Sequence, residues 1–304
     1  CQATKRILNE SKIDASKILA VGISYQMHGL VVVDSDGEPL KNAIIWCDSR
    51  AVEIGNKAFQ DLSPERCTKT LLNSPANFTA SKLKWVKDNE PELFAKIHKF
   101  MLPGDFIAFK LTDEISTTKN GLSEGIFWDY ESDTIADWLL DYFGFDSELV
   151  PKLVENFSPQ GYITNKASLE TGLPEGIPVT YRAGDQPNNA LSLNVFNDGE
   201  VAATGGTSGV IYAVTNNKNS KEPSRINHFA HVNYSTDNQS IGKLLCINGA
   251  GIMYRWLRNQ SSAESYETMN RKASKVPIGS DGLVILPFGN GAERMLNNLN
   301  VGTQ

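Results

Sequence analysis

Cysteine is scarce in this chain, with four among 304 residues, and no two of them are separated by only two residues. The paired-cysteine spacing of zinc sites and thioredoxin-like redox sites is therefore excluded. A chain of this length buries a full core without disulfides. The scattered cysteines therefore favour a reducing, cytoplasmic compartment.

Net positive charge and long apolar runs are also lacking. The formal net charge is −6 at pH 7, which argues against a broad nucleic-acid-binding face and against a polybasic membrane surface. No apolar run reaches the roughly 18 residues that a membrane-spanning helix needs. We therefore expect small molecules, and neither nucleic acid nor membrane, as partners.

Strand-like and helix-like segments alternate along the chain, which predicts an α/β fold. The apolar run at 18–24 predicts a strand buried on both faces. Residues 30–46 predict a hairpin that turns at Asp36-Gly37. The length suggests about two domains, and we place their boundary near residue 193, giving domains 1–192 and 193–304.

Asp185 follows a β-like segment and Gly184, at the mouth of a predicted helix. A carboxylate at the end of a strand is suited to act as the general base that takes the proton from a sugar hydroxyl during phosphoryl transfer. The alternative is a plain helix N-cap, because Asp is favoured at that position. The sequence at this point leaves both open.

A small-residue loop, Gly205-Gly206-Thr207-Ser208-Gly209, lies between two predicted strands. Its backbone N–H groups and two hydroxyls are suited to hold phosphates. The alternative is a tight hairpin without a ligand, in which glycine supplies positive φ. No Walker lysine follows and the run is not G-x-S-x-G, so a P-loop NTPase and a serine hydrolase are poorly supported.

Gln26-Met27-His28-Gly29 directly follows the first predicted strand. Ligands gather beyond the carboxyl ends of strands in α/β sheets. Gln and His offer donors and acceptors for a polyol, and Met offers an adaptable apolar wall. The alternative is a satisfied histidine at a strand end. His228 and His231 have the spacing of metal ligands but lack a nearby Glu or Cys, so we predict no metal site.

Taken together, these elements resemble the FGGY carbohydrate kinases, and the Gln-Met-His-Gly element is most similar to xylulokinases. The resemblance covers essentially the whole chain and is carried by Gly22-Ile23-Ser24-Tyr25-Gln26-Met27-His28-Gly29, Trp46-Cys47-Asp48-Ser49-Arg50, Phe78-Thr79-Ala80-Ser81-Lys82-Leu83-Lys84-Trp85, Gly184-Asp185 and Gly206-Thr207-Ser208-Gly209. It implies two actin-like, ribonuclease-H-like domains around a cleft.

The resemblance also implies an activity, the transfer of the γ-phosphoryl group of ATP, with Mg²⁺, to a ketose, most closely D-xylulose to D-xylulose 5-phosphate. It makes Asp185 the catalytic base. Gln26, Met27, His28 and Gln186 become sugar contacts, and Gly205, Gly206, Thr207 and Ser208 become the phosphate loop. Kinases of ribulose, gluconate or fuculose are alternatives, as is a sugar-binding module without catalysis. A homodimer is a further expectation.

Some family features are different or missing. Gln186 stands where the family commonly has Asn, which lengthens the second sugar contact. The opening Asp-x-Gly-Thr phosphate loop and the late Gly-Gly-Gly adenine element do not occur in the chain. We therefore interpret it as a kinase fragment that lacks both ends, and we expect the fragment as given to be inactive.

Overall fold

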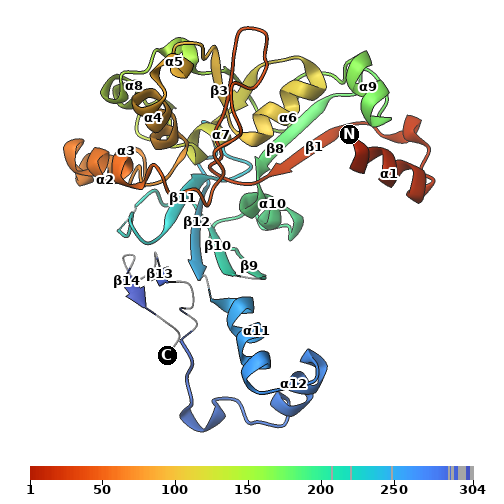
Figure 1. Cartoon of the computed structure of the whole chain (residues 1–304), viewed down its shortest axis with the longest axis vertical. Helices are drawn as coiled ribbons and strands as arrows, with labels where there is room; N and C mark the ends of the chain where they lie inside the picture. The colour runs from red at the N-terminus through yellow and green to blue at the C-terminus, as the bar shows by residue number, and fades with distance from the viewer. Residues whose placement is uncertain are drawn as a thin grey trace.

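The computed structural model describes residues 1–206, 208–219, 221–247, 249–286 and 288, and the backbone of residues 291–293 and 299–301. Figure 1 shows an elongated molecule. The elements from α1 to α9 form its upper part, a second sheet lies below them, and α11 and α12 extend from that sheet to the lower end. The mixture of helices with parallel and antiparallel strands confirms the α/β class.

The α-helices are α1 (Gln2–Ser11), α2 (Val52–Asp61), α3 (Pro64–Thr70), α4 (Thr79–Asn89), α5 (Pro91–Phe94), α6 (Pro103–Thr112), α7 (Lys119–Glu124), α8 (Asp137–Phe143), α9 (Asn165–Thr171), α10 (Asp185–Ser192), α11 (Ala250–Gln260) and α12 (Tyr266–Ala273). The strands are β1 (Val21–Tyr25), β2 (Val31–Val33), β3 (Lys99–Met101), β4 (Ser116–Thr118), β5 (Trp128–Asp129), β6 (Thr134–Ile135), β7 (Lys152–Val154), β8 (Val179–Gly184), β9 (Val201–Gly205), β10 (Gly209–Thr215), β11 (Asn227–Ala230), β12 (Ile241–Ile247), β13 (Gly291–Glu293) and β14 (Leu299–Val301). No helix in the described part of the chain is long and apolar enough to cross a membrane.

β1 and β8 form a parallel pair at the centre of the upper part (Figure 1). Ile23 and Tyr25 of β1 are buried in a cluster that includes residues of α6 and α9. The prediction that this strand is buried on both faces is wrong, because Gly22 and Ser24 are exposed and line a cavity of about 750 Å³. The strand begins only at Val21, so much of the apolar run lies before it.

The hairpin predicted for residues 30–46 is only partly correct. The chain does reverse at Gly37, which has a φ of 77° and donates its N–H to the carbonyl of Asp34. However, the main partner of β2 is β3, distant in sequence, and the returning segment contributes only the isolated bridges Leu30–Ile44 and Val33–Pro39. A pairing across this separation leaves no local signal in the sequence.

The second sheet is antiparallel, with the order β11-β12-β10-β9. α7 packs against β11, and one core cluster contains residues of both parts, including Met27 and Phe229. α7 begins where Thr118 Oγ1 accepts a hydrogen bond from the N–H of Gly121, as expected of an N-cap threonine. The predicted boundary near residue 193 falls directly after α10.

Candidate active site

The predicted sugar contacts and the predicted base leave two adjacent strands at the same edge. β1 ends at Tyr25 and β8 ends at Gly184, and these two residues are partners in the parallel register. The segment that directly follows β1 contains Gln26, Met27 and His28, and it therefore lies beside Asp185, which directly follows β8. This edge is where α/β sheets collect their ligands.

Asp185 is the first residue of α10, and the N-cap position belongs to Gly184. The helix has no side-chain cap, so the interpretation of Asp185 as a plain N-cap is wrong. Its Oδ2 accepts a hydrogen bond of 3.0 Å from Gln186 Nε2. Burial raises the pKa of the Asp185 carboxyl above its ordinary value, and the hydrogen bond from Gln186 opposes this rise.

The strand that carries Asp185 is anchored by Arg182, whose side chain is completely buried. Arg182 Nη1 lies 3.1 Å from Asp105 Oδ1 on α6, and Nη2 donates to Ser116 Oγ at 2.6 Å. Gln160 Oε1 accepts from Arg182 Nε at 3.0 Å. A buried charge is tolerated when it is paired and hydrogen-bonded in this way. β8 therefore presents Asp185 from a fixed position.

His28 is held by the protein on its backbone and on its ring. Its φ is 59°, which is uncommon for a residue with a side chain. Its N–H donates to Glu124 Oε1 at 3.0 Å, and its carbonyl accepts from Lys82 Nζ at 2.8 Å. Nδ1 lies 3.3 Å from the carbonyl oxygen of Glu124. These contacts match the alternative of a satisfied histidine, and they also fix the direction of the half-exposed ring.

Aromatic rings surround the His28 imidazole. Phe78 meets it edge-on with ring centroids 4.6 Å apart, and Phe229 of β11 lies 5.3 Å away. Phe78 and Phe229 also contact each other, at 6.0 Å. The second sheet therefore touches the predicted sugar-binding element directly.

Gln26 and Met27 are placed differently from each other. Gln26 is half-buried, and its Oε1 accepts a hydrogen bond of 3.2 Å from the N–H of Trp46. A few residues after Trp46, Arg50 forms an ion pair with Asp48, with Nη2 2.7 Å from Oδ2. The guanidinium carbon of Arg50 also lies 4.6 Å from the centroid of the Trp85 ring. Met27 is only 5% exposed and belongs to the core cluster.

Two buried ionisable residues of this region were missed as site residues. Lys82 of α4 is completely buried, and burial lowers its pKa to about 8, although the charges of Asp48, Cys47 and Glu124 oppose this effect. Glu124 ends α7 and is 2% exposed. Lys82 lies in one of the sequence elements that carry the family resemblance, so the sequence could have pointed to it as a site residue. Glu124 lies in none of these elements, and nothing in the sequence marks it as a site residue.

The glycine loop is a hairpin turn between β9 and β10. Gly205 pairs with Gly209, and the N–H of Gly206 donates to the carbonyl of Ser208 at 3.0 Å. The expectation of positive φ is wrong for Gly205, Gly206 and Gly209, which all lack it. Gly205 and Gly206 are both exposed; a Cβ added to Gly205 would stand in open space, and one added to Gly206 would lie 3.7 Å from the carbonyl oxygen of Ser208. Thr207 lies outside the described residues.

This turn adjoins the start of α11. The N–H of Gly251, in the first turn of that helix, donates to the carbonyl of Gly206 at 3.0 Å. The turn and the helix N-terminus therefore lie together, and helix N-termini favour anionic groups. This geometry fits a ligand-free hairpin and a phosphate loop equally well.

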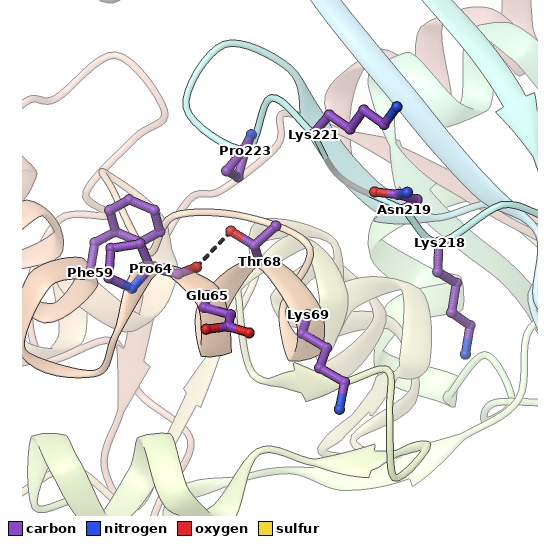
Figure 2. Close-up of a pocket in the computed structure, with 9 residues that line it drawn as sticks. All are labelled: Phe59, Pro64, Glu65, Thr68, Lys69, Lys218, Asn219, Lys221 and Pro223. Carbon is purple, nitrogen blue, oxygen red and sulfur yellow. Dashed lines mark hydrogen bonds between the residues drawn. The ribbon is translucent and has the colours of Figure 1, made fainter.

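A groove of about 640 Å³ lies between α3 and four residues that follow β10 in the chain, namely Lys218, Asn219, Lys221 and Pro223. Figure 2 shows that Lys69 and Lys218 extend to the same side of it, while Lys221 points away from them. Lys218 donates to the carbonyl of Tyr130 and Lys69 pairs with Glu131. This groove contains none of the predicted site residues, so it is distinct from the candidate site.

No group of three or more potential metal ligands occurs among the described residues. His231 is instead buried beside Tyr212, with its Nε2 3.0 Å from the carbonyl oxygen of Val195. Burial lowers the pKa of His231 to about 4.

Comparison with known proteins identifies the family. Residues 1–192 match the N-terminal domain of the FGGY family of carbohydrate kinases. The xylulose kinase of Staphylococcus epidermidis is 30% identical over 292 residues, which cover 94% of this chain and 57% of that protein. The glycerol kinase of Thermococcus gammatolerans is 33% identical over 218 residues, covering 70% of this chain and 43% of that protein.

Solved structures show the same fold. The ligand-bound xylulose kinase from Lactobacillus acidophilus superposes with a TM-score of 0.86 at 24% identity, covering 99% of this chain and 61% of that chain. The glycerol kinase of Plasmodium falciparum with ADP gives 0.86 at 19% identity, covering 100% and 61%. The chain thus spans about three fifths of these solved relatives. It belongs to the FGGY family of carbohydrate kinases.

Proposed function

We propose that the protein containing this chain is an ATP-dependent ketose kinase that converts D-xylulose to D-xylulose 5-phosphate. The observation that carries the proposal is the half-buried Asp185 at the same strand edge as Gln26 and His28. The xylulose kinases among the relatives support the ketose as substrate. A glycerol kinase relative and a gluconate kinase neighbour make other polyols the nearest alternatives.

In the proposed reaction, Asp185 accepts the proton of the terminal hydroxyl of the ketose. The hydroxyl oxygen forms a bond to the γ-phosphorus of ATP as the bond to the bridging β–γ oxygen breaks, and ADP leaves. Burial of Asp185 supports this role, because a carboxyl with a raised pKa is a stronger base. His28 and Gln26 orient the sugar, and Gln186, bonded to the base, adds a contact.

The nucleotide belongs on the side of the second sheet. We propose that the turn containing Gly205, Gly206, Thr207 and Ser208 holds the ATP phosphates through its backbone N–H groups, with support from the start of α11. Magnesium neutralises phosphate charge in reactions of this class. The described residues supply no cluster for it, so no step is assigned to the metal.

The domain boundary near residue 193, a homodimer and a cytoplasmic location belong to the same proposal. The activity is that of the whole protein, because the chain spans only 57–59% of the xylulose kinases of Staphylococcus epidermidis and Staphylococcus xylosus. We expect the chain as given to be inactive.

The test is Asp185→Asn in the full-length protein. We expect ketose kinase activity to fall by about 10²-fold or more, because the amide cannot take the proton. A loss smaller than about tenfold contradicts the assignment of the base. A panel of D-xylulose, ribulose, gluconate and glycerol identifies the substrate. Calorimetry with ketose, with and without nucleotide, separates a kinase from a sugar-binding module.

A further inference from the structure

Glu124 is a buried carboxylate that the proposed reaction does not use. It ends α7, on a different element from every predicted site residue, and its side chain is 2% exposed. Burial raises the pKa of this carboxyl well above its ordinary value, and the hydrogen bond from His28 opposes the rise. A carboxyl group is costly to bury, so its contacts indicate what it does there.

One oxygen of Glu124 holds the sugar-contact loop. Oε1 accepts from the backbone N–H of His28 at 3.0 Å, and the main-chain carbonyl of Glu124 lies 3.3 Å from His28 Nδ1. A carbonyl oxygen only accepts hydrogen bonds, so this contact requires a proton on Nδ1. The same residue therefore fixes the backbone of His28 and the orientation of its ring.

The other oxygen lies against the turn that carries the base. A Cβ built on Gly184 would stand 2.4 Å from Glu124 Oε2 and 2.6 Å from Met27 Cγ. Only a glycine at position 184 leaves room for this carboxylate. Glu124 therefore packs between the residue that precedes Asp185 and the loop that contains His28.

Lys82 completes the arrangement from α4. Its Nζ donates to the carbonyl of His28 at 2.8 Å, and its charge is near enough to Glu124 for the two to affect each other. The peptide groups on both sides of His28 are thus hydrogen-bonded to buried ionisable side chains. This explains how a residue with a side chain keeps a φ of 59°.

We propose that Glu124 is a positioning residue that joins the His28 loop to the Gly184–Asp185 turn and sets the spacing between the sugar contact and the base. The inference rests on the proposed function for its kinetic consequence. Its structural part, the grip on His28, is independent of the substrate.

The kinetic test compares Glu124→Gln with Glu124→Ala in the full-length protein. Gln keeps an oxygen that accepts from His28, so kcat/KM for the ketose should stay within about threefold of wild type. Ala leaves the N–H without this partner, and kcat/KM should fall by about tenfold to hundredfold, mainly in kcat. Glu131→Ala, which removes an exposed carboxylate, is the matched control and should change kcat/KM by less than about twofold.

An equal loss in the Gln and Ala variants, or an Ala variant within about threefold of wild type, overturns the proposal. Values are compared per folded molecule, because a purely structural role would lower the folded fraction and leave kcat unchanged. If Glu124→Ala does not fold, the Gln variant and the spectroscopic test below decide.

The second measurement is independent of the activity. Ring nitrogen NMR of ¹⁵N-histidine-labelled protein should show His28 protonated on Nδ1 in wild type and in Glu124→Gln, with the signal assigned by its loss in His28→Gln. A neutral His28 that is protonated only on Nε2 would contradict the hydrogen bond from His28 Nδ1 to the carbonyl oxygen of Glu124. If the wild-type protein shows this signal but phosphorylates no ketose, the proposed function is wrong, while the hydrogen bonding of His28 by Glu124 is confirmed.

Discussion

Tyr25 and Gly184 are partners at the ends of two parallel strands, so the residues that follow them are brought to one edge of the sheet. The chain after Tyr25 supplies Gln26 and His28, and the chain after Gly184 supplies Asp185. The parallel pairing of β1 with β8 thus brings together residues that are more than 150 positions apart in the sequence. The candidate site therefore depends on strand pairing more than on any loop.

His28 should matter for ketose binding. We expect His28→Ala to raise the dissociation constant of the ketose by about tenfold to hundredfold, the effect of losing one or two polar contacts. Calorimetry on the full-length protein measures this. His98→Ala is the control, because His98 is exposed and lies outside the candidate site. Unchanged binding in His28→Ala would remove His28 from the list of sugar contacts.

Lys82 should make stability rise with pH. Its pKa is about 8 in the folded protein and near 10.4 when unfolded, so the unfolded chain binds more protons between these values. Raising the pH from 7 to 9.5 should therefore add about 2 kcal/mol to the free energy of unfolding through this group.

Lys82→Met isolates that contribution, because the methionine does not titrate. Urea unfolding of both proteins at the two pH values gives the difference. Equal pH dependence in wild type and Lys82→Met would show that Lys82 has an ordinary pKa.

Gly184 should tolerate no side chain. Gly184→Ala places a methyl group 2.4 Å from Glu124 Oε2, so overpacking should lower the free energy of unfolding by about 1–3 kcal/mol. Gly205→Ala is the matched control for stability, because nothing lies within 4 Å of its added carbon. Thermal unfolding compares the two. Similar melting temperatures for both variants would contradict the packing described around Glu124.

Local patterns were enough to predict several parts of this site. The strand that precedes Asp185, the helix that starts at it and the two strands around Gly205 and Gly209 were all predicted from adjacent residues. Each of these elements is set by its own sequence. The family follows from the same short motifs.

What was missed depends on contacts between distant segments. The pairing of β2 with β3, the burial of Glu124 against Gly184 and the contact of Lys82 with His28 each join residues far apart in the chain. Glu124 ends a short helix, where an acidic residue gives no sign of being buried. The absence of positive φ at Gly205 shows that a glycine-rich turn does not reveal its backbone conformation.

The Phe229 ring has a mechanical consequence. Phe229 lies on β11, and its ring contacts the rings of His28 and Phe78. Separating the second sheet from the upper part of the molecule would therefore break both aromatic contacts. Wetting these faces is unfavourable. These ring contacts therefore stabilise the packing of the second sheet against the part of the molecule that carries the candidate site.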